Sequence, residues 1–124
     1  MSDLDLLPAE LAALSRLERE IALPYPEILE AIDALEAKSV LLLGWEAHAT
    51  YPDGGYGAYP SGMIGGILDV SIPPPSEWSE AVSRSAARHR ASIEQEWQTR
   101  SFTPPQDGVE LIFNVTTVTR DAAY

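Results

Sequence analysis

The chain has 124 residues, enough for one domain with an ordinary hydrophobic core, and its 45% apolar and 22% charged residues exclude wholesale disorder. It contains no cysteine, which excludes disulfides and thiolate metal sites. Its net charge of −11 disfavours nucleic acid and anionic membranes as partners, because their phosphates would be repelled. The charge favours a basic protein partner or none, since acidity by itself also keeps a protein soluble.

The N-terminus and the hydropathy predict a soluble, cytoplasmic protein. The first ten residues, MSDLDLLPAE, have no basic region and predict no signal peptide. No apolar run approaches the roughly 18 residues of a membrane span. Arginine outnumbers lysine seven to one, and alanine and proline are common, which favours a bacterial source.

The N-terminal third predicts two helices. Leucines recur at spacings of three and four from Leu7 to Ile21, which indicates a helix with one apolar stripe. Pro24 and Pro26 end that helix. A second helix is expected over 26–38, so the two would form an αα-hairpin over residues 7–38.

The stretch 39–51 predicts a strand that begins buried and ends with one polar face. Period two places these residues on its core side: Leu41, Leu43, Trp45, Ala47, Ala49 and Tyr51. A loop rich in tyrosine, glycine and proline follows up to Gly62. A weaker strand is expected over 63–72, where Gly65 and Gly66 favour a bulge.

The C-terminal half predicts a long helix after three prolines at 73–75, and then a last strand. The helix is expected from Ser76 to about Arg100. Its apolar stripe consists of Trp78, Val82, Ala86, His89, Ile93 and Trp97. Residues 109–119 alternate as a strand does.

These elements predict an α+β fold in the order α-α-β-β-α-β, as a single domain over residues 1–124. The hairpin and the helical crossover give a small antiparallel sheet in which the strands lie in the order second, first, third. We expect the helices to pack on one face of this sheet.

One pair of residues could support catalysis or metal binding. Glu46 and His48 lie two residues apart on the polar face of the first strand, where they could act as an acid–base pair or bind a metal. Further ligands would have to come from His89, Asp53 or Asp69, none at a typical spacing, so ordinary exposed polar residues are the simpler interpretation. Catalytic motifs are lacking, and we expect neither an enzyme nor a cofactor or metal.

Two features favour protein binding. Residues 1–37 carry nine acids against two arginines, a net charge of −7. The predicted partner-binding residues are the outward acids of the second helix and members of the tyrosine loop: Glu27, Glu30, Asp33, Glu36, Tyr51, Asp53, Tyr56 and Tyr59. Tyrosine offers a large contact area at low entropic cost, although such a loop could equally fold over its own sheet.

The sequence therefore predicts an acidic binding module of the immunity or inhibitor type, which neutralises a basic protein such as a toxin. The first alternative is a homo-oligomeric assembly component that forms a homodimer through an exposed helix or a strand edge. The last strand, rich in valine and threonine, could pair with its own copy if it lies at the sheet edge. The second alternative is a small hydrolase or metal protein that uses Glu46 and His48.

Overall fold

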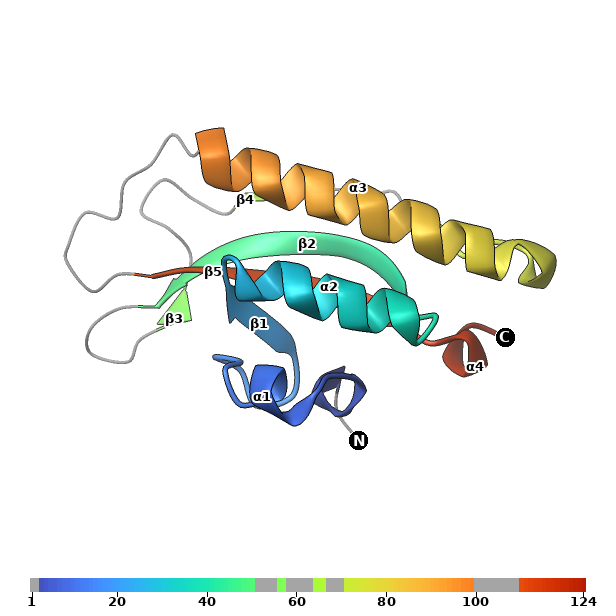
Figure 1. The fold of residues 1–124 in the computed structure, drawn as a ribbon, viewed down its shortest axis with the longest axis horizontal. Helices are drawn as coiled ribbons and strands as arrows, with labels where there is room; N and C mark the ends of the chain where they lie inside the picture. Colours follow the sequence, from blue (N-terminus) through green and yellow to red (C-terminus); the bar gives the residue numbers. More distant parts are fainter. Residues whose placement is uncertain (1–2, 51–55, 58–63, 67–70, 100–109) are drawn as a thin grey trace.

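The computed structural model describes residues 3–50, 56–57, 64–66, 71–99 and 110–124. Its elements are η1 (Asp3–Leu6), α1 (Ala9–Ala12), β1 (Ile21–Pro24), α2 (Glu27–Ala37), β2 (Leu41–Thr50), β3 (Tyr56–Gly57), β4 (Ile64–Gly66), η2 (Pro75–Glu77), α3 (Trp78–Thr99), β5 (Glu110–Val118) and α4 (Arg120–Ala123) (Figure 1).

The strands form an antiparallel sheet centred on β2 and β5. Strand β2 pairs with β5 on one side and with β3 and β4 on the other, and β5 pairs in turn with β1. The predicted α+β class and the strand order second, first, third are confirmed as β4, β2 and β5. Strand β1, which extends the sheet beyond β5, was not predicted.

The predicted first helix is wrong in its extent, because α1 ends at Ala12 and Ile21–Pro24 form a strand. The side chain of Ser15 explains the break. Its Oγ accepts hydrogen bonds from the backbone N–H groups of Leu17 (3.3 Å) and Ala22 (3.1 Å) and lies 2.7 Å from the Glu20 carbonyl. Serine thereby satisfies backbone groups that a continuous helix would have paired.

The last strand is not at an edge, because β5 lies between β1 and β2. Pairing of this strand with a second copy would require a free edge, and β5 does not have one. The outer side of β1 is also occupied: Ser15 Oγ accepts from the Ala22 N–H, and the Ala22 carbonyl accepts from the Arg16 N–H at 2.9 Å. Covering an edge in this way blocks addition of another strand.

The predicted period-two face of β2 is interrupted by a register shift between Leu42 and Gly44. Leu42 therefore joins the main hydrophobic cluster together with Trp45, whereas Leu41 packs in a second cluster with Trp78. The extra residue of a bulge changes which side chains face the core. From Trp45 to Ala49 the predicted alternation is confirmed, because Trp45, Ala47 and Ala49 are buried and Glu46 and His48 are only partly so.

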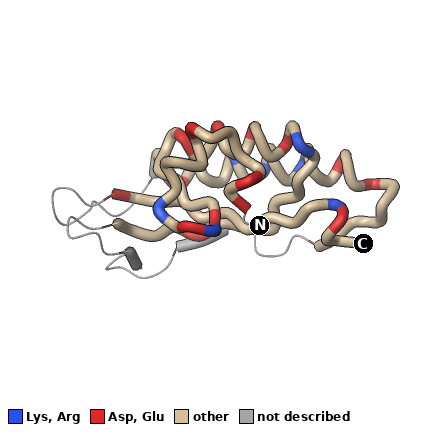
Figure 2. The backbone as a smooth tube through the Cα atoms, turned by 90° about the horizontal axis from the view of Figure 1, so that it is seen from below, with Lys and Arg blue, Asp and Glu red and all other residues tan. Residues whose placement is uncertain are grey.

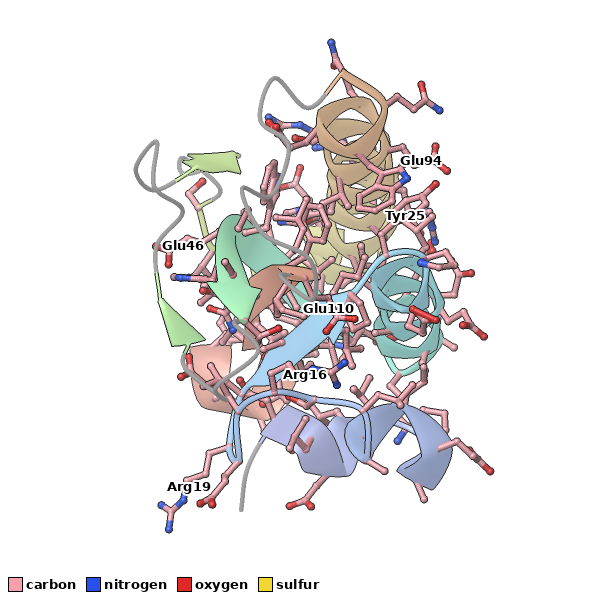
Figure 3. All side chains as sticks on the ribbon, turned by 90° about the vertical axis from the view of Figure 1, so that its left-hand side faces the viewer. Arg16, Arg19, Tyr25, Glu46, Glu94 and Glu110 are labelled. Carbon is pink, nitrogen blue, oxygen red and sulfur yellow. The ribbon has the colours of Figure 1, made fainter. Side chains whose placement is uncertain are left out.

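Helices α2 and α3 lie side by side on one face of the sheet (Figures 1 and 3), as predicted. The predicted stripe of α3 is confirmed: Trp78, Val82, Ala86, His89 and Ile93 are buried, and Trp97 packs against the core. Trp97 stacks on Tyr25, with ring centroids 4.8 Å apart and planes at 13°. Within the described residues, no helix combines the length and hydropathy of a membrane-spanning segment.

Candidate functional site

The face of the sheet opposite α2 and α3 carries the predicted Glu46–His48 pair, and Figure 3 shows Glu46 projecting away from the helices. Glu46 Oε2 lies 3.2 Å from His48 Nε2, and the side chains are 46% and 15% exposed, respectively. The structure thus brings together the two residues that the sequence paired. A carboxylate beside an imidazole can orient the ring and exchange a proton with a bound molecule.

Asn114 lies directly opposite Glu46 on the neighbouring strand β5. It is buried, and its Nδ2 donates a hydrogen bond of 2.9 Å to the carbonyl of Ile21 in β1. The amide therefore ties the edge strand to the sheet next to the Glu46–His48 pair. The alternation of the last strand marked Asn114 as polar, but its partner depends on β1, which the sequence pattern did not reveal.

His89 cannot complete a site with Glu46 and His48. It projects from α3 onto the helix-covered face of the sheet, whereas the pair lies on the opposite face. Its side chain is fully buried, and Nδ1 lies 2.8 Å from the Ser85 carbonyl, which it can reach only as a donor. Asp53 and Asp69 lie outside the described residues. Among the residues that are described, no group of three or more potential ligands could hold a metal ion.

His89 belongs instead to a polar seam between α3 and β2, formed by Ser85, His89 and Ser92. Ser85 Oγ donates to the Leu42 carbonyl at 2.6 Å, and Trp45 Nε1 donates to Ser92 Oγ at 3.0 Å. Spacings of four and three place all three residues on one side of the helix. The sequence pattern places His89 in the apolar stripe but does not single out the two serines. Their contacts depend on β2, which packs against α3 only in the folded protein.

Burial lowers the pKa of His89 below its ordinary value of 6.5, and the nearby positive charge of Arg88 lowers it further. The backbone carbonyls of Ser85 and Gly44 oppose this change without outweighing burial. Nε2 is buried and has no hydrogen-bond partner within the described part of the chain. His89 is therefore a neutral core residue at pH 7.

The predicted acidic face of α2 is partly neutralised from within the molecule. Arg90 of α3 bonds Asp33 at 2.7 Å and also pairs with Glu36. Burial disfavours the Arg90 cation, but its hydrogen bonds and charge interactions with Glu36 and Asp33 raise its pKa above the ordinary value. Two of the four predicted binding acids on α2 thus clamp α2 to α3.

The remaining N-terminal acids are largely free of ion pairs. Arg16 pairs with Glu110 of β5 at 2.7 Å, and Arg19 projects away from the molecule (Figure 3). Six acids of residues 3–37 have no ion pair within the described residues: Asp3, Glu10, Glu18, Glu20, Glu27 and Glu30. We call these six residues the acidic surface. Figure 2 shows the acidic and basic positions along the backbone, which carries more acidic than basic ones.

The tyrosine loop cannot be placed as a site. Tyr51, Asp53 and Tyr59 lie outside the described residues. The backbone of Tyr56 lies in β3, where it pairs with Thr50.

Together, the fold and these surfaces define a small acidic α+β protein: an antiparallel sheet with two helices on one face, a carboxylate–imidazole pair on the other, and an acidic N-terminal surface. No model of a known protein family matches this chain, and neither does any curated protein or solved structure with which it was compared.

Proposed function

We propose that this protein is a non-enzymatic binding module that captures a basic protein partner through its acidic surface, as immunity and inhibitor proteins do. The observation that carries this proposal is the set of six carboxylates that form no ion pair with any described residue, in a region where Arg90 neutralises two other acids. Unpaired surface charges of one sign raise the association rate with an oppositely charged partner.

The ion pairs with Arg90 indicate which acids of α2 can bind the partner. Asp33 and Glu36 would have to release Arg90 before binding a second cation, which costs them existing contacts. Glu27 and Glu30 have no such contact and are the acids of α2 on which the proposal rests.

Reversing the charge of Glu27 and Glu30 together to lysine should remove the partner. In a pull-down from lysate of the source organism, we expect wild type to retain one basic protein stoichiometrically at low salt. At about 0.5 M salt, where the screening length is only a few ångströms, retention should fall sharply. The double variant should retain about tenfold less of that protein even at low salt, because the charge that steers association is gone.

The matched control is Glu77→Lys with Asp121→Lys, which changes the net charge equally at two exposed acids outside the N-terminal third. This variant should bind as wild type does. Equal loss in both double variants would mean that only total charge matters, and no salt-sensitive partner at all would contradict the proposal.

The 3.2 Å contact between Glu46 and His48 supports a second candidate function, a small hydrolase that uses this pair as general base. If so, the protein should cleave an activated ester such as p-nitrophenyl acetate, and His48→Ala should slow this reaction about 100-fold. Thr50→Ala, a change on the same strand face, should leave the rate unchanged. Equal rates for wild type and His48→Ala would exclude this function.

A further inference from the structure

A cavity of about 330 Å³ lies between the segment 71–74 and the first half of α3. Its walls are apolar at Leu41, Ile72 and Pro73, and Ile72 remains 43% exposed there although it is a large hydrophobic side chain. The volume is at the lower end of the range that small-molecule sites occupy.

Two arginines, Arg84 and Arg88, line the same cavity one helical turn apart. Arg84 contacts Glu80 at 2.7 Å, but both side chains are more than 60% exposed, so the pair holds Arg84 only weakly. Arg88 has no ion pair within the described residues. Like charges four residues apart on a helix repel each other, and an anion between them would reverse that repulsion.

Most other described cations are engaged elsewhere. Arg16 and Arg90 form ion pairs, and Arg120 donates to the Pro75 carbonyl. Glu77 also lines the cavity, but it precedes Arg84 by seven residues and Arg88 by eleven, which is about 10 Å and 16 Å along a helix. The two arginines therefore form a local positive site at one end of the cavity, in a protein whose net charge is −11.

We propose that this cavity binds a small organic anion. Arg88 and Arg84 would hold its carboxylate or phosphate group, since the guanidinium fork matches both. The apolar body of the ligand would lie against Ile72 and Leu41. This site shares no residue with the acidic surface or with the Glu46–His48 pair, so a failed test of one proposal does not affect the other.

The test uses the full chain and three probes: benzoate, phenyl phosphate and inorganic phosphate, titrated by calorimetry and by amide chemical shifts. We expect saturable binding of benzoate or phenyl phosphate with a dissociation constant of about 1 mM, typical of a ligand with so few atoms. Whichever of these two probes binds more tightly shows whether the cavity prefers a carboxylate or a phosphate group. Inorganic phosphate should bind about tenfold more weakly, because it lacks the apolar body.

Arg88→Gln should weaken binding of the organic probe about tenfold or more, since a hydrogen bond to a charged group is lost. The matched control is Arg19→Gln, which removes the same charge from an exposed residue without an ion pair in the described chain. Ile72→Ala should weaken the organic probes about threefold and leave inorganic phosphate unchanged.

Three results would overturn the proposal: no saturable binding of either organic probe, equal binding of inorganic phosphate, or equal losses in Arg88→Gln and Arg19→Gln. All substituted positions are exposed, and unchanged thermal unfolding of each variant shows that it is folded.

Discussion

Replacing Phe113 with alanine is expected to lower the free energy of unfolding by about 3–5 kcal/mol. Phe113 is fully buried in the central strand β5. It lies opposite Leu23 of β1 and Ala47 of β2, and its ring centroid is 5.6 Å from that of Trp45. A cavity at this position removes contacts with the strands on both sides, so the surroundings cannot collapse to fill it.

Urea unfolding followed by tryptophan fluorescence measures this loss. Domains of this size are commonly stable by only about 5–15 kcal/mol, so the variant should unfold at a much lower urea concentration. The control is Thr116→Ala, at an exposed position of the same strand, which should change the stability by less than about 0.5 kcal/mol. A loss below about 1 kcal/mol for Phe113→Ala would contradict the central place of this residue in the core.

Acid is expected to destabilise the protein through His89. The pKa of His89 is lowered in the folded state by burial, so below about pH 6.5 the unfolded chain binds a proton that the folded chain does not. The contribution of His89 to the free energy of unfolding is therefore fully present above pH 6.5. It is lost as the pH falls from 6.5 toward the lowered pKa. In that interval the contribution of this one residue reaches about 1.4 kcal/mol per pH unit.

Comparing urea unfolding at pH 7 and pH 5 for wild type and His89→Gln isolates this effect. The variant should lose less stability between the two pH values, because glutamine does not titrate. His48→Gln serves as the control, since it removes the only other histidine of the chain and should retain the acid loss due to His89. If His89→Gln does not fold, NMR of wild type decides: a His89 imidazole, assigned by comparison with His48→Gln, that becomes charged near pH 6.5 in the folded protein would contradict the prediction.

The long periodic segments could be predicted from the sequence. Helix α2, helix α3 and the strands β2 and β5 each repeat their pattern over nine residues or more, and all four were found within two residues of the expected bounds. Over such lengths only one secondary structure buries all the apolar residues. The adjacency of Glu46 and His48 followed from the same period of two.

Short segments could not be predicted in this way. Ile21 continues the helical spacing of the preceding leucines, yet Ile21, Ala22 and Leu23 are fully buried in a strand. Three apolar residues fit either structure, and here the strand is stabilised by backbone pairing with β5 and by the hydrogen bond to Ser15. The bulge in β2 was equally hidden, because nothing in an apolar run distinguishes the residue that will be skipped.

The sequence by itself therefore determined the fold class, the order of the main elements and the acidic balance of the N-terminal third. Only the tertiary structure decided which charged side chains form ion pairs within the chain and which remain available to a partner. Arg90 neutralises Asp33 and Glu36 from more than fifty residues away, and Arg16 reaches Glu110 across 94 residues. Local periodicity reports which face of an element is buried, whereas ion pairs depend on which faces of different elements come together when the core packs.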